Sequence, residues 1–149
     1  MEIDYHERMK LAHQLCFPLY AAARKVVNAY TPLLKPLGLT YTQYVACLAL
    51  WESGETTVGD LCRRLYLDCG TLTPLLKKLE GEGYLTRVRS RTDERVVCLS
   101  VTEKGWALRE KAREIPGRMG SCAPLSPEEG ACLHRLLHKL LEGPDPEER

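Results

Sequence analysis

The sequence has no long hydrophobic run and no recognisable leader. None of its apolar stretches approaches the roughly 20 residues that a helix needs to cross a bilayer. The first residues include Glu2, Asp4, His6 and Glu7, unlike the basic and then apolar start of a signal peptide. We therefore expect no membrane partner and a cytoplasmic location. With 149 residues, the chain has the length of one domain.

The sequence also lacks an excess of either charge, since 21 Lys and Arg face 20 Asp and Glu. A net charge of +1 excludes a bulk polycation, so any nucleic-acid binding must depend on where the charges lie. One stretch concentrates them. Between residues 84 and 97 stand four arginines against two acidic residues, namely Arg87, Arg89, Arg91, Arg95, Asp93 and Glu94.

Paired cysteine motifs are missing too, although the chain has seven cysteines. There is no C-x-x-C pair and no zinc-finger spacing, so we expect neither a disulfide framework nor a metal or other cofactor. Cys62 and Cys69 fall on apolar stripes of predicted helices and Cys47 lies inside an apolar helix, so we expect all three to be packing residues. His134 and His138, four residues apart, could bind a metal. Exposure on the polar face of a leucine-striped helix is the favoured interpretation.

The centre of the chain predicts a helix followed by a β-hairpin. Asp68 to Thr71 supply a helix start, and Gly81 and Gly83 supply its end. Between them, leucines recur at helical spacing at positions 72, 75, 76 and 79. Residues 84–89 and 96–101 are then typical of two strands. Two earlier helices are expected from Thr40 to Gly54 and from Thr57 onward.

Two short helices with a turn at residues 66–70, followed by a hairpin, predict a winged helix-turn-helix that reads DNA. The expected contacts of the reading helix with double-stranded DNA are the short or basic side chains on its polar side, Thr71, Thr73, Pro74 and Lys77. In the wing we expect Arg95 to enter the minor groove and Asp93 to orient it. Arg87, Arg89 and Arg91 either contact phosphates or line a solvated strand face. The alternative is an ordinary helix and hairpin of an α+β enzyme.

The two ends of the chain carry apolar helical stripes. One runs over residues 19–37, with a start or kink at Pro18 and a bend at Pro32. The others lie in predicted helices at 102–119, whose end Pro116 and Gly117 should disturb, and at 126–141. We expect residues 1–38 and 103–142 to form a helical dimerisation region around a winged head at 39–102, with a disordered tail at 143–149. The fold class is therefore mainly α with a small β wing. A homodimer would present two reading helices to a palindromic site. Packing of both stripes within one monomer is the alternative.

Over nearly its full length the sequence resembles the MarR family of winged-helix transcription regulators. The resemblance rests on Leu72-Thr73-Pro74-Leu75-Leu76-Lys77-Lys78-Leu79, Arg91-Thr92-Asp93-Glu94-Arg95 and Leu99-Ser100-Val101-Thr102-Glu103-Lys104-Gly105. Three further blocks resemble the organic hydroperoxide resistance regulators within that family. They are Gln14-Leu15-Cys16-Phe17-Pro18-Leu19-Tyr20, Leu39-Thr40-Tyr41-Thr42-Gln43-Tyr44 and Leu65-Tyr66-Leu67-Asp68.

This resemblance implies a repressor, not an enzyme, that leaves its operator when an organic hydroperoxide oxidises Cys16. A helix start near Pro18 would favour a thiolate there. The resemblance further implies that Tyr30 and Tyr41 hydrogen-bond the sulfur. Cys16 and Tyr30 are 14 residues apart, roughly 21 Å along one straight helix. Tyr30 would then come from the other subunit or across a bend.

A sulfenic acid at Cys16 needs a resolving thiol. Cys122 lies in a flexible Gly-Ser-Cys-Ala-Pro connection and is preferred to Cys132, which falls inside the last helix. Two other functions stay open at this point. One is a repressor released by a small phenolic or lipophilic ligand at the dimer interface. The other is a thiol peroxidase, which the lack of a His or Arg motif beside a cysteine disfavours.

Overall fold

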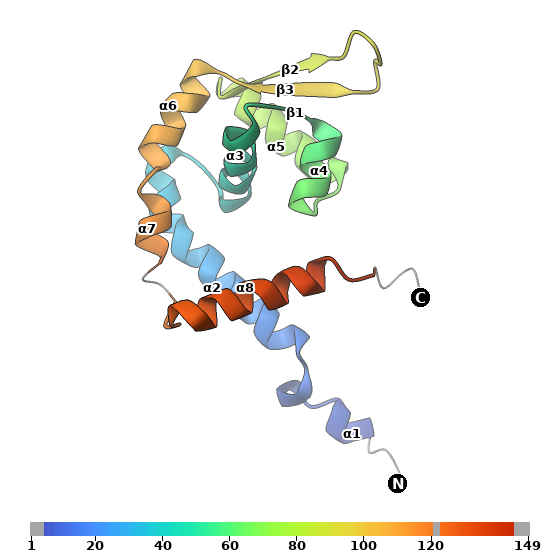
Figure 1. Cartoon of the computed structure of the whole chain (residues 1–149), viewed down its shortest axis with the longest axis vertical. Helices are drawn as coiled ribbons and strands as arrows, with labels where there is room; N and C mark the ends of the chain where they lie inside the picture. The colour runs from blue at the N-terminus through green and yellow to red at the C-terminus, as the bar shows by residue number, and fades with distance from the viewer. Residues whose placement is uncertain (1–4, 121–122, 145–149) are drawn as a thin grey trace.

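Helices make up most of the computed structural model, which describes residues 5–120 and 123–144. Figure 1 shows a head of helices and strands, from which one long helix, α2, leads away, with α8 lying across it. The elements in order are α1 (Tyr5–Arg8), η1 (Leu11–His13), α2 (Cys16–Leu34), η2 (Lys35–Leu37), α3 (Tyr41–Ser53), β1 (Glu55–Thr57), α4 (Val58–Leu65), α5 (Cys69–Gly81), β2 (Leu85–Arg89), β3 (Val97–Val101), α6 (Glu103–Ala112), α7 (Ile115–Met119) and α8 (Pro127–Leu141).

The helices begin where the sequence predicts their N-caps. Thr40 and Ser126 both form complete capping boxes, with Gln43 and Glu129 at the third helical position. Helices α4, α5 and α6 are capped in a similar way. The side chains of Thr57, Asp68 and Thr102, respectively, accept a hydrogen bond from the backbone N–H of the third helical residue. None of the helices in the described residues combines the length and hydropathy that a bilayer span requires.

The prolines of the terminal helices lie in first turns or inside a helix. Helix α2 begins at Cys16, so that Pro18 falls in its first turn, and it continues through Pro32 to Leu34. A left-handed glycine, Gly38 with φ of 68°, follows η2. The helix expected at 102–119 is divided into two, α6 and α7, close to the predicted disturbance at Pro116. The proline ring of Pro116 would clash with the carbonyl of Ala112, four residues earlier, and α6 ends at that residue.

The sheet has a third strand that the sequence analysis did not anticipate. The order is β1-β3-β2, all antiparallel, with Thr56 opposite Leu99 and Arg87 opposite Leu99 on the other side. Strand β1 has only three residues, which is too short for an alternating pattern to appear in the sequence. It ties the start of α4 to the wing.

The core lies in the head. Helix α5 buries Leu72, Leu76 and Leu79 completely, and Leu99 of β3 is equally buried. Trp51 of α3 packs with them and donates its indole N–H to the carbonyl oxygen of Gly105 at 3.0 Å. Leu48 of α3 lies outside this core, because its side chain is 37% exposed.

Gly105 provides a test of this packing. A Cβ built there would lie 2.2 Å from the carbonyl oxygen of Tyr84, which is backbone and cannot move aside cheaply. We expect Gly105→Ala to lower the free energy of unfolding by about 3 kcal/mol or more in urea denaturation. Gly81→Ala is the control, because a Cβ there meets nothing within 4 Å and should leave stability equal or slightly higher. Equal stability of the two variants would contradict the described fit of α6 against the head.

Candidate nucleic-acid interface and thiol site

The first turns of α5 are held by hydrogen bonds within the helix. The carboxylate of Asp68 accepts the backbone N–H of Thr71 at 2.8 Å and its hydroxyl at 2.7 Å. These bonds from Thr71 hold the pKa of Asp68 below its ordinary value. The hydroxyl of Thr73 donates to the carbonyl oxygen of Cys69 at 2.7 Å. Both threonine protons are used within the helix, so toward an external ligand these residues offer oxygen acceptors and methyl groups.

The predicted DNA contacts lie on the solvent side of α5. Thr71, Pro74 and Lys77 are exposed and Thr73 is half-buried. The leucines of the same helix at positions 72, 76 and 79 point into the core. Helix α5 therefore presents short side chains and two lysines, Lys77 and Lys78, to solvent on a rigid support.

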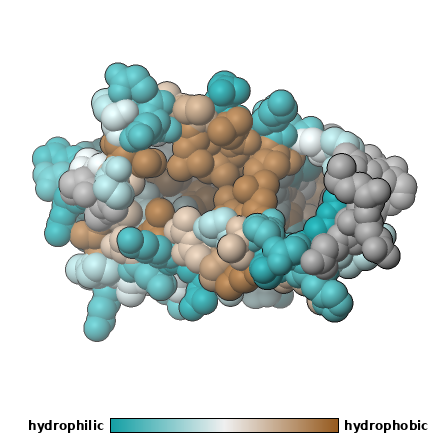
Figure 2. All heavy atoms as spheres, turned by 90° about the horizontal axis from the view of Figure 1, so that it is seen from below, coloured by the Kyte–Doolittle hydropathy of each residue, from teal (hydrophilic) through white to brown (hydrophobic). Residues whose placement is uncertain are grey.

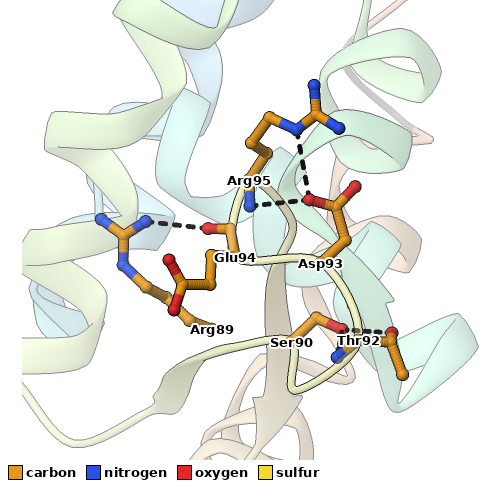
Figure 3. Close-up of polar contacts among 6 residues, drawn as sticks. All are labelled: Arg89, Ser90, Thr92, Asp93, Glu94 and Arg95. Atoms are coloured by element: carbon orange, nitrogen blue, oxygen red, sulfur yellow. Dashed lines mark hydrogen bonds and ion pairs between the residues drawn. The ribbon is translucent and has the colours of Figure 1, made fainter.

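The tip of the wing is organised by Asp93, as Figure 3 shows. Its carboxylate oxygen accepts the backbone N–H of Arg95 at 3.0 Å and the Nε–H at 3.2 Å. Arg89 donates from its guanidinium to the carbonyl oxygen of Glu94 at 2.9 Å. The Arg95 side chain remains 92% exposed. Its contact with Asp93 therefore sets the direction of a guanidinium that is still available to a partner.

The other two wing arginines differ from each other. The guanidinium of Arg87 lies 3.6 Å from the carboxylate of Glu80 on α5, and its side chain is only 19% exposed. It thus joins β2 to the reading helix and is neither a solvated residue nor well placed for a phosphate. Arg91 is exposed in the loop between the strands.

Cys16 is the first residue of α2 and is exposed. Tyr30 and Tyr41 are in contact, with ring centroids 5.0 Å apart, at the junction of α2 and α3. Because α2 is continuous from Cys16 to Leu34, the spacing of roughly 21 Å between Cys16 and Tyr30 holds within one chain. The structure brings the two tyrosines together but does not bring Cys16 to them.

A third tyrosine belongs to the same cluster and was missed in the sequence. The ring of Tyr44 lies 5.8 Å from that of Tyr30. Burial, together with the neighbouring Tyr30 and Tyr41, raises the pKa of Tyr44 above its ordinary value. Its hydroxyl therefore stays protonated at neutral pH. The signal in the sequence was its position three residues after Tyr41, on the same face of α3.

Cys62 lies in the core as expected, but the expectation that Cys62 and Cys69 are inert packing residues outside any disulfide is wrong. They form a disulfide, with Cα atoms 5.8 Å apart, and Cys69 is exposed while Cys62 is buried. The reason is local. Tyr66 adopts a left-handed backbone with φ of 53°, which turns the chain so that the first residue of α5 lies beside α4. The leucine stripe of α5 does not extend to that first turn.

The remaining thiols have distinct environments. Among the described residues, Cys16, Cys47, Cys98 and Cys132 are unpaired, and only Cys47 is buried. Burial, with a smaller effect of Glu82, raises the pKa of Cys47 to about 12, which makes that thiol unreactive. Cys132 is exposed on α8, and the preferred resolving residue, Cys122, lies outside the described residues.

The histidine pair on α8 makes no recognisable metal site. His134 and His138 place their Nε2 atoms 3.2 Å apart and are both exposed. Within the described part of the chain, no group of three potential metal ligands comes together.

An apolar surface without a partner lies on α2 and α8. No residue of α8 is buried, and in α2 only Leu34 is. A groove of about 410 Å³ between the two helices is lined almost entirely by leucines, at positions 15, 19, 133, 136, 137 and 140, with Lys139. Viewed from below, the molecule shows a wide brown hydrophobic area (Figure 2). Cys16 lies next to Leu15, at the margin of this surface.

Comparison with known proteins places this architecture in a family. A family model described as transcriptional regulator SarA/Rot matches residues 28–113. The organic hydroperoxide resistance transcriptional regulator of Bacillus subtilis is 48% identical over 136 residues, 91% of this chain and 92% of that protein. The regulator SarZ of Staphylococcus aureus is 41% identical over 111 residues, 74% of this chain and 75% of that protein.

Solved structures agree with the sequence relatives. Reduced AbfR bound to DNA superposes with a TM-score of 0.76 at 36% identity, covering 91% of this chain and 96% of that one; AbfR comes from Staphylococcus epidermidis. A MarR variant from E. coli complexed with operator DNA gives a TM-score of 0.77 at 25% identity, covering 85% and 93%. These are winged helix-turn-helix proteins, which confirms the predicted fold class.

The comparisons also decide between the function classes. The matched proteins are transcriptional regulators, so the thiol peroxidase and the α+β enzyme are excluded as descriptions of this chain. The chain belongs to the MarR family of winged-helix transcriptional regulators and, within it, to the group of organic hydroperoxide resistance regulators.

Proposed function

We propose that this protein is a homodimeric repressor that releases a palindromic operator in the cytoplasm when an organic hydroperoxide oxidises Cys16. One observation carries the proposal. The exposed sulfur of Cys16 stands at the first residue of α2, beside the leucines that line the unpartnered apolar surface. A chemical change there acts on the surface by which two chains would meet.

The apolar surface supports a second copy of the chain as its partner. Helix α8 has 15 residues and a leucine face, yet buries none of them in the isolated chain. Helices of this kind gain stability chiefly from packing of their apolar face, not from intrinsic propensity. A two-fold arrangement would cover the leucines of α2 and α8 in both chains at once and would set the spacing of two α5 helices.

A dimer also resolves the separation of Cys16 from the tyrosines. Within one chain the first residue of α2 and the cluster of Tyr30, Tyr41 and Tyr44 lie far apart along the helix. If the two α2 helices pack antiparallel, the start of one lies near the end of the other. The hydroxyls of Tyr30 and Tyr41 would then reach the partner's sulfur and donate hydrogen bonds to its thiolate.

Oxidation would change that contact. The Cys16 thiolate attacks one peroxide oxygen, the O–O bond breaks, the alcohol leaves, and the sulfur becomes a sulfenic acid. A second thiol, Cys122 or Cys132, then displaces water to close a disulfide. Tyr41 belongs to α3 of the head, so a change at its hydroxyl is passed to the reading helix through packed helices. The tilt or spacing of the two heads would change.

On DNA, the exposed side of α5 fits the major groove and the wing fits the adjacent minor groove. Thr71, Thr73, Pro74 and Lys77 would contact bases and phosphates. Arg95, directed by Asp93, would enter the minor groove, while Arg89 shapes the wing and Arg91 approaches the backbone. We give Arg87 no direct contact because of its ion pair with Glu80.

A ligand-released repressor is the second candidate. A cavity of about 390 Å³ between α3 and the α6–α7 segment is lined by the rings of Tyr44 and Trp51, and by charged side chains of both signs, Arg109, Arg113, Glu52 and Glu110. Such a lining suits a small aromatic ligand with polar groups. The Cys16 variant described next separates this candidate from the thiol sensor.

Cys16→Ser should retain operator binding but lose its response to oxidant. We expect cumene hydroperoxide to release the parent protein from an operator selected from random double-stranded DNA, whereas the variant stays bound in a gel-shift titration. Cys98→Ser is the matched control, because this exposed thiol is unpaired and lies on the wing strand β3. If the oxidant released the Cys16→Ser variant from the operator, the thiol-sensor mechanism would be contradicted.

Leu136→Glu should separate the dimer into monomers. The leucine is 45% exposed in one chain and lines the groove between α2 and α8, where a buried carboxylate would be unpaired. Light scattering after gel filtration measures the mass directly. Val88→Glu makes a similar change on an exposed strand residue and should leave the dimer intact. A dimeric Leu136 variant would mean that two copies meet elsewhere.

Arg95→Ala should weaken operator binding about tenfold or more and make the logarithmic salt dependence shallower by about one ion. Asp93→Ala should reduce the operator affinity by a smaller factor. It should cause no additional loss in the Arg95→Ala background, because the role of Asp93 is to orient the Arg95 side chain. Fluorescence anisotropy over a salt series gives both quantities. Lys111→Ala, an exposed cation on α6, is the control for charge alone. Additive losses for the Asp93 and Arg95 variants would contradict the orienting role.

A further inference from the structure

We propose that Cys62 and Cys69 are a second redox site, at which a reversible disulfide protects the reading helix from irreversible oxidation. The proposal rests on the DNA-reading role of α5 proposed above. Its basis is the disulfide itself, which links α4 to the first residue of α5 across seven positions of sequence. It forms while Leu72, Leu76 and Leu79 remain completely buried, so bond formation requires no opening of the head.

The two thiols have unequal access to an oxidant. Cys69 is exposed, and Cys62 is only 6% exposed within the core cluster. A bulky organic hydroperoxide can therefore reach Cys69 first. Cys69 also stands at the N-terminus of a 13-residue helix, where the positive end of the dipole favours a thiolate. Cys62 is shielded from the oxidant but lies beside Cys69, so it reacts with the oxidised sulfur of Cys69 and not with the hydroperoxide.

The chemistry takes two steps and one equivalent of hydroperoxide. The Cys69 thiolate attacks a peroxide oxygen, the O–O bond breaks, and the alcohol leaves with a proton, so that Cys69 becomes a sulfenic acid. The Cys62 sulfur then attacks the Cys69 sulfur, the S–O bond breaks and water leaves. Two thiols have been oxidised to a disulfide and one hydroperoxide has been reduced to an alcohol and water. A dithiol reductant converts the disulfide back to two thiols by thiol–disulfide exchange.

The position of Cys69 makes this bond protective. A sulfenic acid that stays unresolved can react with a second hydroperoxide to give a sulfinate, which is anionic and not recovered by thiols. At Cys69 that charge would stand two residues before Thr71, on the part of α5 that faces phosphates, and would oppose DNA binding. The disulfide is neutral and leaves α5 in place. Oxidation at this pair thus preserves DNA binding, and oxidation at Cys16 ends it.

The test compares two full-length proteins in which Cys16 is already serine: Cys16→Ser, and Cys16→Ser with Cys62→Ala. Each is treated with excess cumene hydroperoxide and digested with trypsin. Arg63 and Arg64 separate the two cysteines, so trypsin leaves them on different peptides that only a disulfide holds together. Binding to the selected operator is measured on the same samples before treatment, after treatment and after dithiothreitol. Equal binding of the two untreated proteins shows that Cys62→Ala folds.

In Cys16→Ser we expect a linked Cys62–Cys69 peptide pair, about 2 Da lighter than the two thiol peptides, and operator affinity within about twofold of the untreated protein. In the double variant we expect a gain of about 32 Da on the Cys69 peptide and a loss of affinity of about tenfold or more that dithiothreitol does not reverse. Adding Cys69→Ser to the double variant should abolish that loss.

Three results would overturn the proposal. They are the absence of the linked peptides in Cys16→Ser, an unmodified Cys69 in the double variant, and loss of DNA binding when the disulfide forms. The peptide masses do not depend on DNA. If the untreated Cys16→Ser protein bound no DNA, the proposed function would fail while the linked peptides still reported on the redox site.

Discussion

The packing of α5 through Leu72, Leu76 and Leu79 is the constraint on which the rest of the head depends. Three completely buried side chains on one face of a 13-residue helix fix the rotation of that helix about its axis. The opposite side is thereby exposed, and it carries Thr71, Pro74, Lys77 and Lys78. The ion pair between Glu80 and Arg87 then fastens the wing strand β2 to the same helix, so helix and wing are presented as one rigid unit.

Outside the head, apolar side chains remain exposed in the single chain. Helix α2 is long enough to leave the head, and α8 lies against it without burying any of its own residues. One chain does not supply enough apolar contacts to bury the leucines of these two helices. This exposed surface connects the thiol at one end of α2 with the tyrosine cluster at the other. The surface that needs a partner is bordered by Cys16, and the far end of α2 contacts α3 through Tyr30 and Tyr41.

The cysteines show how environment assigns different chemistry to one side chain. Cys47 is buried and its pKa is about 12, so it stays a thiol. Cys16 is exposed at a helix start beside an apolar surface, where oxidation can alter an assembly. Cys69 is also exposed at a helix start, but a neighbour seven residues earlier can close a neutral bond with it. On this proposal the two thiols differ in where the second sulfur lies: Cys69 has one within the same head, seven residues away, whereas the disulfide of Cys16 would form at the surface where two chains meet.

The sequence by itself determined the features that depend on neighbours along the chain. Caps at Thr40, Thr57, Asp68, Thr102 and Ser126, the leucine stripe of α5 and the two long strands all follow from local hydrogen bonding and periodicity. So does the contact between Asp93 and Arg95, which are two residues apart in a tight loop.

Only the tertiary structure decided what depends on approach in space. Strand β1 exists because β3 passes beside it, Arg87 is neutralised because α5 carries Glu80 to it, and the left-handed turn at Tyr66 brings Cys69 to Cys62. Periodicity assigned both of those cysteines to the core, which holds for Cys62 but not for Cys69, because periodicity records the face of a helix and not where the core ends. The separation of Cys16 from Tyr30 could be predicted from the sequence and is also seen in the structure. Within one continuous helix, the distance between two residues follows from their sequence spacing at about 1.5 Å per residue.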